Sequence, residues 1–570
     1  MSPRRPDAVS QHGRDDRPQD ERVGRRAFLE RMGVAVLAGK GAALPPVSHR
    51  SDRLVTNVVP PPLAVPQVAS PAEWTLAEGL QAVRDGGVSA TEWAEACLAR
   101  IRRQDGVLKA FNAVPHDQVL EQARALDDVP RRGILHGAPL AIKDNYATAG
   151  IPTTANSLIF EGWVPDFDAT TVERLKRAGS IVLGKTQMGP LATTRATKPD
   201  GTRTTVNAWA PNDDAVSPGG SSSGSATSVA ARLAASSTGT QTGGSITVPS
   251  TAQGLTGLKP TMGRVSLNGI IPLTYTRDHP GPIARDAMDA ALMLQVMAGA
   301  DSRDPRTQGL PPVPDYVRAA TVQRPGMLRW PVTIGVTPDY LDEGEDGEDR
   351  VRAAARRNML DTFRSLGALV RDVPWPEQWE VLTSFNLNNV RLPERTEPFL
   401  PYLKGDVRLF GVSLSPWING LLLSGDEYLK GQRAKLALLD RILSTFFVDC
   451  DVVVLNRHLA FDMVGLPLMA FPIGFDESEG HRLPVGGLIG GKPFSEERLL
   501  SLVAGYQSVT EHHRARPVDA VRDGDDGGGS ARPGAGPRPP SSIRPAAAHQ
   551  EAAGRSPLRL TLTDVDREGE

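Results

Sequence analysis

One short segment of the chain places a hydroxyl beside an unusually open backbone. Residues 242–246 read TGGSI, and consecutive glycines let backbone N–H groups turn toward one point without side-chain obstruction. Cleavage of an amide or ester without histidine needs a hydroxyl nucleophile, a base that takes its proton, and N–H donors for the developing oxyanion. Ser245 supplies the hydroxyl, and the glycine-rich backbone around it supplies the donors.

A base for this chemistry is found about a hundred residues earlier. In APLAIKDN, Lys143 directly follows an apolar run, where loss of water lowers the pKa of a lysine toward a usable range. Alone, each feature is weak, because most GGS sequences are loops and most lysines are solvated. Together they make Ser245 and Lys143 the candidate nucleophile and base of an acyl-transfer site.

The elements that must position these residues follow an alternating pattern. Strand-like runs such as APLAIKD, SIVLGKT and DVVVLN alternate with helical runs such as DATTVERLKRAG. This alternation predicts an α/β fold with a mixed sheet covered by helices. EWTLAEGLQAVRDGG predicts an amphipathic helix ended by glycine, and Ser89 to Glu92 form a capping box that opens the next helix.

The stretch from Ser217 to Ser250 allows two interpretations. Its composition of Ser, Gly and Thr is typical of a flexible linker. However, two glycine-serine clusters flank the run VAARLAA, which predicts a helix packed between them. The second interpretation places the chemistry of the protein in this stretch.

Two other motifs suggest different enzymes. Gly179 to Thr186, GSIVLGKT, fits the phosphate-loop pattern, but a helical run precedes it and SIVL is itself strand-like, the reverse of the order that phosphate binding needs. GSSSG fits the nucleophile elbow of α/β-hydrolases, with Ser222 as nucleophile and His279 or His458 downstream. An elbow needs a hydrophobic strand before it, whereas PNDDAVSPG is a polar loop, so this remains the weaker alternative.

The order and spacing of several segments resemble the amidase signature hydrolases. That family shows a lysine in a G-x-P-x-x-x-K-D segment, then a GGSS[SG]G loop, then a GGSIR segment. Here these are GAPLAIKDN, SPGGSSSGSA and GTQTGGSITVP. The resemblance continues through IPTTANS, GLKPTMGRVSLNGIIPLTYTRDHPGPIARDAMDAALML, GLPLMAFPIGF and LPVGGLIGGKPFSEERLLSLVAGY, and covers about residues 72–516. It implies the amidase signature fold, a mixed twisted β-sheet core with helices on both faces.

The resemblance also implies roles for single residues. Lys143 would be the general base, Ser221 the bridging serine on a non-proline cis peptide bond, and Ser245 the nucleophile. A proton would pass from Ser245 through Ser221 to Lys143, and water would then release the acid from an acyl-enzyme. The oxyanion hole would consist of the N–H groups of Thr242, Gly243, Gly244 and Ser245. No metal or cofactor is implied.

Three further positions qualify this resemblance. Gln241 stands where the family usually has Asp, and Thr247 where it usually has Arg. Losing both charges together leaves no uncompensated buried charge, which predicts a neutral change; a loosened loop and a catalytically impaired protein is the alternative. Met188 lies in a segment that borders the acyl pocket in the family, and plain core packing is an equal alternative.

The ends of the chain differ in composition from its middle. Residues 1–50 carry Arg25 and Arg26 before a modest apolar segment, a pattern that resembles a twin-arginine export signal, although Lys40 interrupts it. We expect residues 51–71 to form a Pro-rich linker and residues 72–515 the amidase domain. Residues 516–570 are rich in Gly, Pro and Arg, and this composition predicts a disordered tail. We therefore expect a protein exported by the twin-arginine route, with a cytoplasmic location as the alternative.

Bulk composition narrows the class of partner. The 570 residues carry a formal net charge of −2, which gives no reason to expect a nucleic-acid partner, and no apolar run is long enough to span a bilayer. Two cysteines, Cys97 and Cys450, are too few for a disulfide framework or a cysteine-based zinc site. The partner expected is a small-molecule amide, which makes the protein a hydrolase of linear amides. The alternatives are the glutamine-hydrolysing subunit of a tRNA-dependent amidotransferase, which an export signal would oppose, and a non-catalytic protein that keeps the fold.

Overall fold

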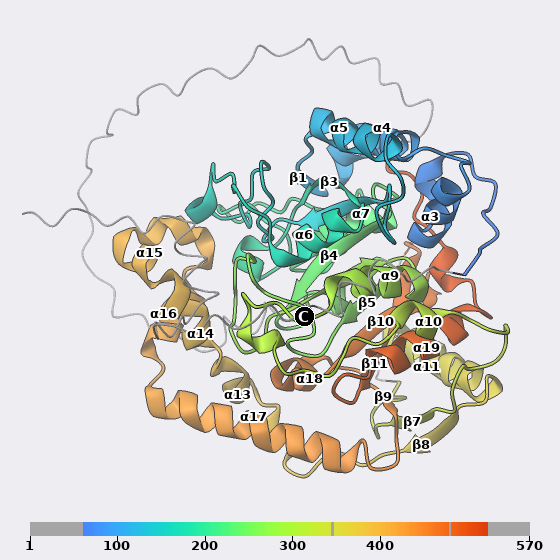
Figure 1. The fold of residues 1–570 in the computed structure, drawn as a ribbon. Coiled ribbons are helices and arrows are strands. Elements are labelled where there is room, and N and C mark those ends of the chain that lie inside the picture. Colours follow the sequence, from blue (N-terminus) through green and yellow to red (C-terminus); the bar gives the residue numbers. More distant parts are fainter. Residues whose placement is uncertain (1–60, 344–346, 478–479, 522–570) are drawn as a thin grey trace, which may run out of the picture.

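The computed structural model describes residues 61–343, 347–477 and 480–521 (Figure 1). The predicted export signal, residues 51–60 of the linker and the tail from residue 522 onward lie outside these ranges. Within the linker, residues 61–70 form no helix or strand, and the Pro66 carbonyl accepts a hydrogen bond of 2.9 Å from the Trp74 indole.

The described residues form one sheet of 11 strands in the order β1-β3-β2-β4-β6-β5-β10-β11-β9-β7-β8. The strands are β1 (Phe111–Ala113), β2 (Pro139–Lys143), β3 (Ile181–Thr186), β4 (Ser236–Gln241), β5 (Thr256–Lys259), β6 (His279–Ala284), β7 (Thr333–Val336), β8 (Leu369–Asp372), β9 (Val452–Val454), β10 (Leu468–Asp476) and β11 (Leu483–Gly491). β2 runs parallel to β3 and β4, and β7 runs parallel to β8 and β9, whereas the strands between these groups pair antiparallel. The sheet is therefore mixed, as predicted.

Helices lie on both sides of this sheet (Figure 1). They are α3 (Leu76–Arg84), α4 (Ala90–Leu108), α5 (His116–Asp127), α6 (Thr170–Arg177), α7 (Ser223–Ala230), α8 (Thr247–Ala252), α9 (Ala287–Met297), α10 (Tyr316–Ala320), α11 (Gly347–Ser365), α12 (Trp379–Leu382), α13 (Phe385–Asn389), α14 (Leu392–Thr396), α15 (Leu400–Gly405), α16 (Ser415–Leu422), α17 (Gly425–Thr445), α18 (Leu459–Val464) and α19 (Glu496–Gln507). The α/β fold with covered faces is confirmed.

The two helices predicted at the start of the folded region are confirmed with their caps. Thr75 and Glu78 form a capping box at the start of α3, and Gly86 follows the end of this helix with a positive φ of 73°. Ser89 and Glu92 form the predicted capping box of α4. These caps satisfy N–H groups that would otherwise lack acceptors at a helix start.

The serine-rich stretch is not a linker, because every residue from 221 to 242 is buried. Its helix α7 spans Ser223–Ala230 and begins inside the first glycine-serine cluster, so only Val229 and Ala230 of the run VAARLAA are helical and the predicted position of the helix is wrong. Serines are poor helix formers when they compete for backbone bonds, but here the hydroxyls have fixed acceptors. Ser223 Oγ donates to the Gly219 carbonyl at 2.6 Å and Ser225 Oγ to the Thr238 carbonyl at 2.8 Å.

The phosphate-loop pattern lies in the geometry that its context predicted. α6 ends at Arg177, Gly179 adopts a positive φ of 92°, and Ile181 begins the fully buried strand β3. Lys185 donates from β3 to the Tyr146 carbonyl at 2.5 Å and to Thr153 Oγ1 at 2.6 Å. Because Ile181–Thr186 form a buried strand and Lys185 bonds within the protein, this segment cannot wrap a phosphate.

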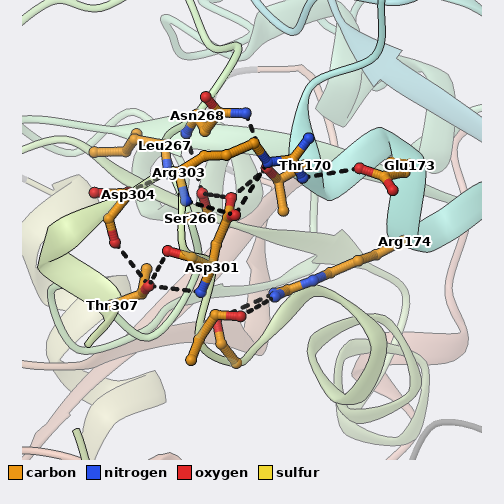
Figure 2. A network of polar contacts seen from close by, with 12 residues as sticks. Thr170, Glu173, Arg174, Ser266, Leu267, Asn268, Asp301, Arg303, Asp304 and Thr307 are labelled. Atoms are coloured by element: carbon orange, nitrogen blue, oxygen red, sulfur yellow. Dashed lines mark hydrogen bonds and ion pairs between the residues drawn. The ribbon is translucent and has the colours of Figure 1, made fainter. Parts of the chain in front are cut away.

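A polar network fixes the loop that lies beside the end of β2. Figure 2 shows Asp301 accepting hydrogen bonds from Thr170 of α6 and from Ser266, the latter at 2.7 Å. The Leu267 N–H donates to Asp304 at 2.8 Å. The same loop continues to Gly269, whose carbonyl accepts from Ala147 N at 2.9 Å. The network therefore holds the backbone that follows Lys143.

Residues 516–521, predicted as the start of the tail, contact the folded body. Within residues 516–521, Asp519 forms an ion pair of 2.7 Å with Arg100 of α4, and Val521 bonds to Gln104. These contacts make residues 516–521 part of the folded body, which corrects the predicted boundary at residue 516.

Two further properties concern the described ranges alone. No helix in them is long and apolar enough to cross a membrane, and no group of three His, Cys, Asp or Glu side chains is placed to hold a metal ion. Cys97 and Cys450 are both buried and unpaired.

Candidate active site

Lys143 is the last residue of β2 and is fully buried. Its Nζ atom lies 2.9 Å from Ser221 Oγ, 2.8 Å from Thr240 Oγ1 and 3.3 Å from the Thr240 carbonyl oxygen. Asn145 Nδ2 also donates to Thr240 Oγ1, at 3.2 Å. The amine is thus held by hydroxyl and carbonyl oxygens, and no carboxylate of the described residues forms an ion pair with it.

Burial sets the protonation of this amine. Loss of water lowers the pKa of Lys143 well below 10.5, and the distant charge of Asp278 opposes this only in part. A buried ammonium without a carboxylate partner is costly, so the neutral amine is favoured. Neutral Lys143 can accept a proton from Ser221.

Ser221 lies between the first glycine pair and α7. The peptide bond between Gly220 and Ser221 is cis, as the family resemblance implies. The Ser221 carbonyl accepts from Gly189 N at 3.0 Å, which anchors the turn on the segment after β3. The structure thereby brings Lys143 and Ser221 into direct contact.

Ser222, the nucleophile of the elbow alternative, has another function. Its buried hydroxyl donates to the Ser245 carbonyl at 2.5 Å and joins the two serine clusters. His279 Nδ1 lies 3.2 Å from the Gln241 carbonyl, and burial lowers its pKa to about 3. His458 Nδ1 lies 2.8 Å from Asp462 Oδ2. These partners give Ser222 a structural role and do not support an elbow.

Ser245 follows β4 by four residues and precedes α8. It is 6% exposed, and neighbouring Gly243 is exposed. The backbone N–H groups of Thr242, Gly243 and Ser245 have no acceptor among the described residues. Three of the four predicted donors are therefore available to a substrate oxygen.

The N–H of Gly244 is not available, which corrects the predicted set of four oxyanion donors. It donates to Asp462 Oδ2 at 2.9 Å. Gly244 has a positive φ of 80°, which turns its N–H toward α18, and a Cβ there would lie 2.7 Å from His458 Nε2. The physical reason is the buried carboxylate, which needs donors and takes this one.

Asp462 places a carboxylate next to Gln241, which stands at the position where the family usually has an Asp. Gln241 Nε2 donates to Asp462 Oδ1 at 2.7 Å, and Gln241 Oε1 accepts from the N–H groups of Ile246 and Thr247 at 2.8 and 2.9 Å. Thr247 Oγ1 also lies 3.2 Å from Gln241 Oε1. The loop is therefore bonded to a carboxylate, supplied by residue 462, and both polar atoms of the Gln241 side chain have hydrogen-bond partners.

The sequence did not identify Thr240 or Asp462 as site residues. Thr240 lies inside the GTQTGGSI segment and differs in no visible way from its neighbours. Asp462 stands four residues after His458, a helical spacing that indicates a pair on one face, but nothing in the sequence connects it to residue 241. Only the strand order, in which β10 pairs with β5, β5 with β6 and β6 with β4, shows this link.

The structure favours core packing over pocket lining as the role of Met188. It is fully buried in a hydrophobic cluster with Ala147, Phe160, Phe399 and Trp417. Core packing accounts for this side chain, so the structure does not support a pocket-lining role for it.

Comparison with known proteins agrees with the fold and the sequence motifs. The family profile described as Amidase matches residues 92–391. The chain belongs to the amidase family. It is 32% identical over 494 residues to one of the subunits of glutamyl-tRNA(Gln) amidotransferase from Chloroflexus aurantiacus, covering 78% of this chain and 98% of that protein. The corresponding protein of Anaeromyxobacter dehalogenans is 35% identical over 465 residues, covering 72% and 91%.

Solved structures of amidase-family proteins resemble this chain as well. The peptide amidase of Stenotrophomonas maltophilia is 29% identical with a TM-score of 0.67, covering 79% of this chain and 99% of that one. An amidase family protein of Bacillus anthracis is 27% identical with a TM-score of 0.64, covering 77% and 91%. The chain is thus an amidase-family protein of the kind that acts on carbon–nitrogen bonds.

Proposed function

We propose that the protein hydrolyses carboxamides through an acyl-enzyme on Ser245, with Ser221 as proton relay and Lys143 as general base. The observation that carries the proposal is the buried Lys143 amine, 2.9 Å from Ser221 Oγ. A lysine buried without a carboxylate costs stability, and a base needs this environment to be neutral near pH 7. The arrangement therefore suits proton transfer better than it suits structure.

The proposed reaction has two balanced halves. Ser245 Oγ attacks the amide carbon while its proton passes to Ser221 and the Ser221 proton to Lys143. The free N–H groups of Thr242, Gly243 and Ser245 stabilise the oxyanion, which in well-studied sites contributes about 3–4 kcal/mol for a donor. The relay returns a proton to the leaving amine as the C–N bond breaks. Water then repeats the attack, and the carboxylic acid leaves Ser245.

A second candidate is the hydrolysis of glutamine as part of a tRNA-dependent amidotransferase. The curated relatives carry that name and match almost their full length, which favours this candidate over a stand-alone amidase. The peptide amidase of known structure supports the stand-alone enzyme. Ammonia release from glutamine, compared with release from butyramide and from a peptide amide, separates the two.

Export by the twin-arginine route is a further proposal, and it rests on Arg25 and Arg26 in the sequence. It would oppose a role beside cytoplasmic tRNA. N-terminal sequencing of protein from the cell envelope tests it, and an intact N-terminus found only in cytosol would contradict it.

A serine-directed probe tests the catalytic proposal. We expect a fluorophosphonate to label Ser245 in the intact chain and Ser245→Ala to lower amide hydrolysis at least about 10,000-fold. Ser236→Ala is the matched control, because Ser236 is buried on β4 and its hydroxyl has no partner among the described residues. Absence of labelling in folded protein would support the catalytically impaired alternative, and labelling at Ser222 would support the elbow.

A further inference from the structure

Arg277 is a buried cation that forms no ion pair with any described residue. Its side chain is 2% exposed, and its one hydrogen bond within these ranges is from Nη1 to Asn388 Oδ1 of α13, at 2.7 Å. Nε is buried without a partner there. A buried guanidinium normally has a carboxylate or several acceptors. Arg277 therefore retains the capacity to bind an acceptor from outside the protein.

The carboxylates near Arg277 are occupied by other donors. Asp278 accepts from Thr242 Oγ1 and from two backbone N–H groups, and Glu394 accepts from Thr276, Tyr428 and Gln432. Asp462 accepts from Gln241, Gly244 and His458. All three lie near enough to oppose the lowering of the Arg277 pKa that burial causes. None of them forms an ion pair with the guanidinium within the described ranges.

The sheet register places Arg277 at the nucleophile loop. β4 and β6 pair Gln241 with His279, so two residues beyond this pair Arg277 stands opposite Gly243. Gly243 is exposed, and a Cβ on it would meet a single atom within 4 Å, Arg277 Nη2 at 3.9 Å. The space in front of an available oxyanion donor is therefore open and is bordered by the guanidinium.

We propose that Arg277 binds a carboxylate on the substrate, so that the preferred amides carry an acid group beside the scissile carbonyl. This inference rests on the proposed amide hydrolysis. The Nε and Nη2 atoms that lack partners form one edge of the guanidinium, and their parallel N–H groups match the two oxygens of a carboxylate. Asn388 holds Nη1 and so fixes the plane of the fork. An acceptor with a single oxygen on Nη2 would leave the buried Nε–H unsatisfied.

Matched pairs of amides test this inference without turnover. Succinamate and butyramide differ by a carboxylate in place of a methyl group, and glutaramate and valeramide form a second pair that is one methylene longer. Calorimetric titration of the full-length Ser245→Ala chain measures binding of each. We expect at least one acid amide to bind about 10- to 100-fold more tightly than its neutral partner, and Arg277→Gln in the same background to remove this preference. Equal affinities within both pairs, or a preference that persists in Arg277→Gln, would overturn the proposal.

Two controls separate recognition from structure. Lys435→Gln removes a neighbouring half-buried cation, which bonds to Thr276 Oγ1 at 2.7 Å, and should leave the preference intact. Arg277→Lys keeps the charge but lacks the two-atom edge, so it should weaken the preference while keeping the fold. A lower melting temperature in Arg277→Gln with unchanged preference would assign Arg277 a structural role instead. Hydrolysis of butyramide by the wild-type chain is measured separately, so that loss of the proposed function and loss of acid recognition are distinguished.

Discussion

The serine-rich segment and the helical segment from α12 to α17 are built in opposite ways. Residues 221–242 are all buried, although most are small or polar. In contrast, α13 has no buried residue, and α17 buries three of its 21 residues. Leu421, Leu422 and Leu436 of this second segment are exposed. In Figure 1 the labelled helices α13 to α17 (yellow-brown to orange) lie to the left of and below most of the strands.

This difference indicates which of the two segments should tolerate amino-acid substitutions. Most buried hydroxyls in the first segment have a hydrogen-bond partner among the described residues, and a Cβ on Gly224 or Gly239 would lie within 3 Å of a neighbour. Most substitutions there therefore leave a group unsatisfied or a neighbour displaced. The second segment contributes single contacts, such as Asn388 on Arg277, from helices with little buried surface. The proposed relay serine Ser221 thus lies in the first segment, whereas Arg277, the proposed carboxylate-binding residue, is held in part by the second.

The largest effect is expected at Lys143, which contacts Ser221 of the serine-rich segment. Lys143→Ala should lower kcat/KM for amide hydrolysis by about 100- to 10,000-fold, because the base is lost. Lys185→Met is the matched control, since Lys185 is an equally buried strand lysine that bonds to Tyr146 and Thr153 instead of a serine. Steady-state kinetics with a chromogenic amide checks both. Equal loss in the two variants would assign the effect to buried lysines in general and contradict a specific base.

The pH dependence sharpens the same assignment. Burial lowers the pKa of Lys143 well below 10.5, and the neutral amine is the active form. The rate should therefore rise with pH through the lowered pKa and reach its plateau below pH 10.5. Between the lowered pKa of the folded chain and the ordinary pKa of 10.5 in the unfolded chain, Lys143 carries a proton only in the unfolded chain. The free energy of unfolding should therefore increase as pH rises through this interval. A pH–rate profile of kcat/KM that falls between pH 7 and 9 would contradict the assignment.

The support of the loop gives the next largest effect. Asp462→Asn should lower the free energy of unfolding by about 3 kcal/mol, because it removes a buried carboxylate that accepts three hydrogen bonds near Lys259. Gln241→Asp alone should also destabilise, since two carboxylates would then meet. The double variant moves the charge back to residue 241 and should recover about 1–3 kcal/mol. Chemical denaturation of all four chains checks this, and simple additivity of the two losses would disprove the compensation.

A pair of glycines gives the smallest effect and contrasts the two segments directly. A Cβ on Gly224 in α7 would lie 2.2 Å from the Ala110 carbonyl oxygen, whereas a Cβ on Gly425 in α17 would meet nothing within 4 Å. Gly224→Ala should cost about 1–3 kcal/mol through overpacking, and Gly425→Ala should be neutral or gain up to about 1 kcal/mol. Melting temperatures measure both. Similar values for the two variants would mean that the segments are packed alike.

The sequence predicts what depends on local pattern. Strand runs, capping boxes and the glycine turns that carry Ser221 and Ser245 repeat fixed local chemistry, so their type and order could be inferred. The contact between Lys143 and Ser221 was expected from a family resemblance and not from spacing. The donation of the Gly244 N–H to Asp462 could not be expected, because it depends on strand order across 218 residues. The helices between residues 379 and 445 show no pattern that sets their place against the sheet.

The hydrogen bond between Gln241 and Asp462 also has a consequence for the synthesis of the protein. The two residues lie 221 positions apart, which at about 5–20 residues per second is roughly 10–40 s of synthesis. Until residue 462 leaves the ribosome, the loop around Ser245 lacks the acceptor that turns Gly244. A nascent chain therefore carries Ser245 and Lys143, the proposed nucleophile and base, long before it can hold the loop in its final geometry, and the proposed activity should arise only when nearly the whole fold has been made.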